Sequence, residues 1–89
     1  RCAGAHTVTY VNRAVTDGPA RFGFIVSRQV GGAVVRNTVR RRLKALCHES
    51  LPTVAPGSDI VIRALPSAAT ASFSDLRADV ARCLARRAA

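Results

Sequence analysis

The segment from Ala33 to Glu49 constrains the fold most, because its apolar and charged side chains separate onto two faces of one helix. The apolar residues recur at the spacing of a buried helical stripe, made of Val35, Val39, Leu43 and Leu46. The polar face carries a row of cations four residues apart with two neighbours on the adjoining ridge, namely Arg36, Arg40, Lys44, Asn37 and Arg41. The pattern predicts a helix that packs through one face and presents several positive charges on the other.

The charge balance of the whole chain indicates a polyanionic partner. Fourteen Lys and Arg residues against five Asp and Glu residues give a net charge of +9 over 89 residues, and a small domain carries such self-repulsion when a polyanion relieves it. A solvated helix face, the alternative interpretation, normally mixes signs, but the segment from Arg28 to Lys44 has no acidic residue. The absence of apolar runs of about 20 residues and of Trp anchors argues against a membrane partner. Nucleic acid is the favoured partner.

The remaining elements predict a single α+β domain over residues 1–89. Residues 6–12 and 21–27 are rich in β-branched and aromatic residues, and we expect them to pair as an antiparallel hairpin. Residues 59–65 form an almost wholly apolar strand, expected at the centre of the sheet. A capping box from Ser72 to Asp75 begins a second helix, and the cations of its last turns suit the helix dipole, namely Arg82, Arg86 and Arg87. The expected architecture is a small sandwich in the order strand, strand, helix, strand, helix.

The cysteines and acidic residues give little support to catalysis by the protein alone. The three cysteines are odd in number and contain no C-x-x-C pair, which predicts reduced thiols in the cytoplasm at Cys2, Cys47 and Cys83. Cys47 and His48 are neighbours on a helix and point about 100° apart, so they do not form a nucleophile and base. The acidic residues are dispersed, which disfavours a nuclease with paired metal ions. We therefore expect no catalytic residue and no metal ligand on this chain.

Several polar and aromatic residues admit two interpretations. Asn37 either reads a base edge, a 2′-hydroxyl or a backbone atom of RNA, or bonds its own backbone. The amides of Gly31 and Gly32 at the helix start either cradle a phosphate or serve only the turn. Tyr10 either stacks on a base or fills the sheet face. Arg63 is either an ion-paired core residue or a cation on an exposed groove.

The central block resembles the protein component of bacterial ribonuclease P, especially in actinobacteria. In that family a strand ending Gly-hydrophobic-Ser-hydrophobic-Ser-Lys-Lys leads through hydrophobic-Gly into Ala-Val-x-Arg-Asn-Arg-x-Lys-Arg. This chain reads Gly-Phe-Ile-Val-Ser-Arg-Gln over residues 23–29 and Ala-Val-Val-Arg-Asn-Thr-Val-Arg-Arg over residues 33–41. Residues 59–66, Asp-Ile-Val-Ile-Arg-Ala-Leu-Pro, are similar to the family's strand after the helix. The resemblance covers essentially the whole chain, although Thr38 stands where the family has Arg and Gln29 where it usually has Lys.

The resemblance implies a fold like domain 2 of ribosomal protein S5, with a left-handed crossover around the basic helix. It implies a non-catalytic subunit whose partner, the ribonuclease P RNA, performs the Mg²⁺-dependent removal of the 5′ leader from precursor tRNA. We expect Mg²⁺ to be bound mainly by that RNA, and no obligate protein partner. The residues expected to contact RNA are Arg28, Gly31, Gly32, Arg36, Asn37, Arg40, Arg41 and Lys44. Those expected in a cleft for the leader are Tyr10, Arg21, Phe24 and Arg63.

The family also has an N-terminal helix that lines one wall of this leader cleft, and we expect it to be absent here. A ribosomal-type structural RNA-binding module without a role in cleavage is the alternative function, because the charge pattern fits it equally well.

Overall fold

The sheet of the computed structural model, which describes residues 1–13 and 17–87, has the strand order β1-β2-β4-β3. The strands are β1 (Cys2–Ala3), β2 (Thr7–Asn12), β3 (Arg21–Ile25) and β4 (Asp59–Ala64). β4 pairs antiparallel with β2 and parallel with β3. The prediction that residues 59–65 are central is confirmed. The predicted hairpin between residues 6–12 and 21–27 is wrong, because β4 lies between these two strands.

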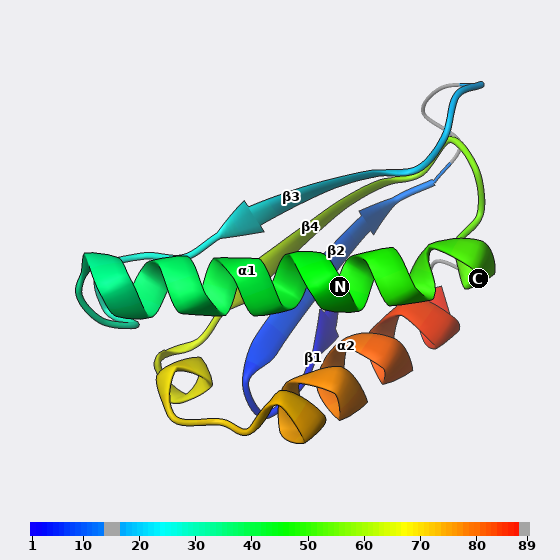
Figure 1. Cartoon of the computed structure of the whole chain (residues 1–89). Helices are drawn as coiled ribbons and strands as arrows, with labels where there is room; N and C mark the ends of the chain where they lie inside the picture. Colours follow the sequence, from blue (N-terminus) through cyan, green and yellow to red (C-terminus); the bar gives the residue numbers. More distant parts are fainter. Residues whose placement is uncertain (14–16, 88–89) are drawn as a thin grey trace.

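Both helices cover the same face of the sheet (Figure 1). α1 (Ala33–Ser50) follows β3 and leads into β4 through a short 3-10 turn, and α2 (Phe73–Arg87) ends the described chain. In Figure 1, α1 lies in front of the sheet, β3 and β4 both run toward the left, and β4 lies below β3. The β3–α1–β4 crossover is therefore left-handed, against the general preference for right-handed connections and in agreement with the expected fold.

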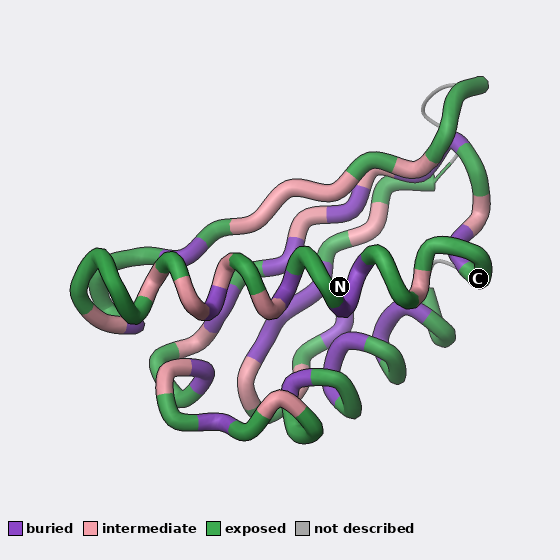
Figure 2. The backbone as a smooth tube through the Cα atoms, in the orientation of Figure 1, coloured by how far each residue is buried: buried purple, intermediate pink, exposed green. Residues whose placement is uncertain are grey.

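Buried residues lie along both helices and along the strands of the sheet (Figure 2), and they form the core. Its largest fully buried side chains come from α1, β4 and α2, and they include Leu43, Leu46, Ile60, Ile62, Leu76 and Leu84. Val39 completes the predicted stripe of α1, whereas Val35 is 37% exposed. Val35 lies in the first turn of the helix, where its side chain is only partly covered. Within the described residues, neither helix is long and apolar enough to cross a membrane.

Alternation along the strands divides the sheet into a helix-covered face and a face without helices, which we call the open face. Phe22 and Phe24 of β3 pair in register with the buried Ile60 and Ile62, so they face the helices. The other registered positions define the open face. Its exposed or half-buried members are Tyr10, Asn12, Arg21, Gly23, Ile25, Asp59, Val61 and Arg63, and the buried Val8 also belongs to it.

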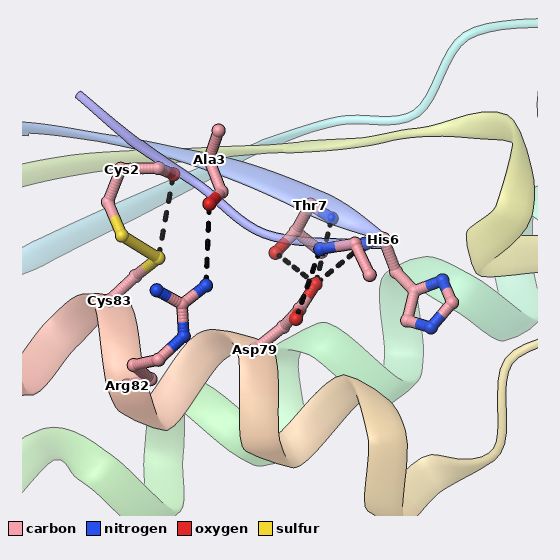
Figure 3. Close-up of a disulfide and its surroundings, with 8 residues drawn as sticks. Cys2, Ala3, His6, Thr7, Asp79, Arg82 and Cys83 are labelled. Atoms are coloured by element: carbon pink, nitrogen blue, oxygen red, sulfur yellow. Dashed lines mark hydrogen bonds between the residues drawn. A yellow bond between two sulfur atoms is a disulfide. The ribbon is translucent and has the colours of Figure 1, made fainter.

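The edge strand β1 is fastened to α2 by a disulfide between Cys2 and Cys83, whose Cα atoms lie 5.6 Å apart (Figure 3). The prediction of three reduced thiols is therefore wrong for two of them. The two cysteines are 81 residues apart in sequence, so their spacing gave no sign that β1 packs on the last turns of α2. Only Cys47 is free among the described cysteines, and it is buried.

A buried carboxylate beside this disulfide holds the turn between β1 and β2 (Figure 3). Asp79 of α2 accepts hydrogen bonds from the backbone N–H groups of Ala5, His6 and Thr7, at 3.3, 2.7 and 3.2 Å. The Thr7 hydroxyl donates a fourth, at 3.4 Å. A Cβ on Gly4 would lie 2.6 Å from the Asp79 carboxylate. The turn therefore needs both the acid and the glycine.

The start of α1 depends on a second glycine, and this gives a first test. Gly31 has φ +157°, and a Cβ there would lie 2.9 Å from the Cβ of Val35. We expect Gly31→Ala to lower the free energy of unfolding by about 1–2 kcal/mol. Gly32→Ala is the matched control, because Gly32 has φ −71° and a Cβ there would meet nothing within 4 Å. Equal losses in urea unfolding of the two variants would contradict the steric explanation.

Candidate nucleic-acid interface

The cation row of α1 runs along the flank of the helix that borders β3. Arg36 and Arg40 are half-buried, and Lys44 is exposed at the edge of a cavity shared with β3. Asn37 and Arg41 are exposed on the outer ridge, as predicted. Arg42, on the opposite flank, instead donates to the carbonyl of Ala71 at 3.4 Å. The structure therefore separates the predicted RNA-binding cations from one that connects α1 to the segment before α2.

The N-terminus of α1 presents backbone donors without a side-chain cap. Gly32 is the N-cap residue, it makes no side-chain capping bond, and the first turn contains no acidic residue. The Nε of Arg36 is buried and has no hydrogen-bond partner among the described residues. An uncapped helix N-terminus carries a partial positive charge and free N–H groups, which suits a phosphate. Gly31, Gly32 and Arg36 thus form one end of the cation row.

Two polar side chains near this end form hydrogen bonds within the helix. Asn37 accepts from the guanidinium of Arg40 at 3.1 Å, so it orients a cation of the row. This contact matches neither earlier interpretation of Asn37, which invoked RNA or the local backbone. Thr38, at the position where the family has Arg, donates its hydroxyl to the carbonyl of Val34 at 3.0 Å. Thr38 therefore supplies no charge to the interface.

An apolar cavity of about 250 Å³ lies between β3 and α1 beside the cation row. Its lining consists of Ala20, Phe22, Phe24, Lys44, Cys47, His48 and Leu51. Burial raises the pKa of the Cys47 thiol to about 12, so the thiol stays protonated and is a poor nucleophile at neutral pH. Glu49, which follows Cys47 and His48 in the sequence, forms an ion pair with Arg77 at 3.1 Å. No nucleophile and base are therefore assembled from these three residues.

The four residues expected in one leader cleft lie on two faces of the sheet. Phe24 faces α1, whereas Tyr10, Arg21 and Arg63 lie on the open face. Tyr10 is 36% exposed and Arg63 is also exposed, so neither belongs to the core. The guanidinium of Arg21 donates to both carboxylate oxygens of Asp59, at 2.9 and 3.0 Å. This bond and the neighbouring negative charge raise the pKa of Arg21.

A hollow of about 590 Å³ at the end of the open face is lined by residues from both predicted groups, the RNA contacts and the leader cleft. Arg28, predicted to contact RNA, and Arg63, predicted in the leader cleft, both line it. Ile25 and Leu65 supply apolar surface between them, and Ile25 is 48% exposed. An apolar floor with two guanidinium groups suits a base and its phosphate.

The family profile described as "Ribonuclease P" matches residues 1–88. The chain belongs to the ribonuclease P protein family. A curated relative, the ribonuclease P protein component of Acidothermus cellulolyticus, is 47% identical over 87 residues, which are 97% of this chain and 72% of that protein. The corresponding protein of Nocardioides sp. is 46% identical, and the alignment covers 97% of this chain and 76% of the relative.

Solved ribonuclease P proteins share the fold of this family member at low sequence identity. The protein from Thermotoga maritima superposes with a TM-score of 0.84 at 21% identity, covering 98% of this chain and 82% of that one. The protein from Staphylococcus aureus gives a TM-score of 0.79 at 24% identity, covering 92% and 74%. At these identities the comparison establishes the fold alone.

Two exposed apolar positions beside the candidate interface of this ribonuclease P protein were not predicted from the sequence. Val34 is 80% exposed on the first turn of α1, and Ile25 lines the hollow beside Arg63. The alternation of residues 21–27 already placed Ile25 on the face of Arg21, which was a usable signal. For Val34 the signal was its position outside the apolar stripe of the helix, which predicts an exposed side chain. An exposed valine beside a cation row suits contact with a sugar or a base.

Proposed function

We propose that this chain binds the RNA subunit of ribonuclease P through α1 and that the RNA performs the cleavage of precursor tRNA. The observation that carries the proposal is the N-terminus of α1, where uncapped backbone N–H groups meet the buried, unpaired Nε of Arg36. Arg40, Arg41 and Lys44 extend this positive surface along the helix. Membership of the family and the names of its curated relatives support ribonuclease P RNA as the polyanion.

The open face is the proposed contact for the 5′ leader of precursor tRNA. Tyr10 offers an exposed ring for base stacking, and Arg63 offers a guanidinium at the edge of the hollow. Arg21 is the weaker candidate for a phosphate contact, because Asp59 already neutralises it. Phe24 would instead support the leader-facing strand from behind, through its packing against α1.

The proposed reaction uses Mg²⁺ held mainly by the partner RNA. In the part of the chain that the structure describes, no three His, Cys, Asp or Glu side chains gather as a metal site. In this proposal the protein residues bind and orient RNA, and the RNA subunit performs the hydrolytic step of tRNA 5′-end maturation.

Reconstitution with a transcribed ribonuclease P RNA from an actinobacterial relative tests the proposal. At limiting Mg²⁺, cleavage of precursor tRNA at the mature 5′ end should rise only when protein and RNA are both present, because cations at α1 lower the repulsion between RNA and substrate. Binding of a precursor with a leader should also gain more from the protein than binding of one without. Rapid cleavage by protein alone would contradict the division of labour. RNA binding without any gain in cleavage would favour a structural RNA-binding module.

A further inference from the structure

Four arginines gather at the end of the molecule that is distant from the start of α1. They line a cavity of about 310 Å³ with Val11, and they are Arg1, Arg13, Arg86 and Arg87. Arg1 precedes β1, Arg13 follows β2, and the other two form the last turn of α2. In Figure 1 the ends of β2 and α2 lie at the right, whereas α1 begins at the far left. This arginine cluster is therefore separate from the cation row.

The segments that carry the arginine cluster are held together by specific contacts. The Nε of Arg13 donates to the backbone carbonyl of Arg87 at 2.9 Å, which joins the end of β2 to the end of α2. The disulfide between Cys2 and Cys83 fixes the strand after Arg1 to the same helix (Figure 3). Arg82 adds a bond to the carbonyl of Ala3 at 3.3 Å. The guanidinium groups therefore converge on a built surface, which reduces the entropy cost of binding an anion.

Positive charge is concentrated at the arginine cluster. Among the residues that the structure describes, no acidic side chain lines the cavity. Glu49 and Asp59 pair with Arg77 and Arg21, and Asp79 binds the turn before β2. The C-terminus of a helix carries only about half a negative charge, whereas four guanidinium groups meet here. The expectation that the last arginines of α2 serve the helix dipole therefore explains only part of the cluster.

We propose that the arginine cluster is a second binding site for the phosphodiester backbone of RNA. The inference rests on the proposed function, in which α1 makes the first contact with the same RNA. The planar fork of arginine matches phosphate oxygens in pairs, and arginines from three segments suit successive phosphates of a folded strand. Two contacts at opposite ends of the domain fix the orientation of the protein on the RNA and raise the overall affinity.

The first test compares two double variants of the full chain, each removing two positive charges. Arg86→Gln with Arg87→Gln removes half of the cluster. The matched control, Arg42→Gln with Arg77→Gln, removes two cations outside the cavity that take no part in holding the cluster together. For the cluster variant we expect binding to ribonuclease P RNA to weaken by about tenfold at 0.15 M salt. The slope of log affinity against log salt should become shallower by about one to two units. Equal losses in both variants would overturn the inference, because only net charge would then matter.

The second test works without RNA and separates this inference from the proposed function. Inorganic phosphate is titrated into the wild-type chain while the side-chain Nε–H resonances of arginine are followed by NMR. Saturable shifts of Arg13, Arg86 and Arg87 are expected, and the shift of the retained Arg13 should weaken in the cluster variant but persist in the control. If the chain shows these shifts but fails to bind ribonuclease P RNA, the anion site is supported and the proposed function is contradicted. No saturable shift at these arginines would overturn the site, whatever α1 binds.

Discussion

Replacing Asp79 with alanine is expected to lower the free energy of unfolding by about 3 kcal/mol, the largest stability loss we predict for one side chain. Asp79 is only 8% exposed, and its carboxylate accepts three backbone N–H groups and the hydroxyl of the fully buried Thr7. Hydrogen bonds to a charged group contribute about 1.5–3 kcal/mol each, and the donors of the buried Thr7 add a desolvation cost when they lose their partner. Urea unfolding under reducing conditions, where the disulfide no longer holds β1, measures the full effect.

Two further variants make the Asp79 prediction specific. Gly4→Ala should reproduce much of the loss, because its Cβ would occupy the space of the Asp79 carboxylate. Asp75→Asn should lower the free energy of unfolding only slightly. Asp75 is exposed, and it bonds the hydroxyl of Ser72 through its backbone N–H, which the substitution keeps. With the disulfide intact, the loss in Asp79→Ala should shrink, since β1 stays tethered to α2. A Gly4→Ala variant as stable as wild type would contradict the proposed role of the turn.

The helices and the central strand could be predicted because their signals are local. Glycines before Ala33 and prolines after Ser50 mark the two ends of α1, and the apolar period inside it needs no tertiary information. The structure gives Ala33–Ser50, one residue longer than predicted. The apolar run after Asp59 similarly identifies a strand buried between neighbours. Val35 was the exception, because periodicity tells which face a residue occupies but not whether anything covers that face at a helix end.

The strand order could not be predicted, because it depends on pairing between distant segments. Residues 6–12 and 21–27 keep their apolar faces inward both as a hairpin and with β4 inserted between them. Sequence neighbours pair more often than not, and here that preference led to the wrong arrangement. The contacts of Asp79 and the Cys2–Cys83 disulfide each join residues more than 70 apart in sequence. An odd cysteine count further concealed the disulfide.

The candidate site was predicted best where it lies within one element. The cation row follows from helical spacing alone, and the structure places its five residues as expected along α1. The leader cleft was assembled from the family resemblance, and it combined Arg21 and Phe24 although strand alternation assigns them opposite faces. The arginine cluster was missed because its members come from three segments. Residue types and charge could not show that Arg1, Arg13 and the end of α2 would meet.

Replacing Arg36 and Arg40 together with glutamine is expected to weaken binding to ribonuclease P RNA by about 30-fold at 0.15 M salt. Each lost phosphate contact reduces the slope of log affinity against log salt by about 0.7–0.9, which corresponds to about fivefold at this salt concentration. Arg36 should contribute at least a full contact, because its buried Nε lies beside the uncapped helix end. Fluorescence anisotropy over a salt series measures both the affinity and the slope.

Control variants on α1 distinguish the effect of a cation's position on RNA binding from the effect of net charge. Arg42→Gln removes the same charge from the same helix, but its guanidinium points to the carbonyl of Ala71 rather than along the row. It should leave the slope nearly unchanged, whereas Arg40→Gln alone should lower it by about one unit.

Thr38→Arg restores the cation that the family has at that position and should tighten binding by about fivefold. If Arg40→Gln and Arg42→Gln weaken binding equally while both stay folded, α1 acts only through net charge, and its cation row would not be a positioned RNA interface.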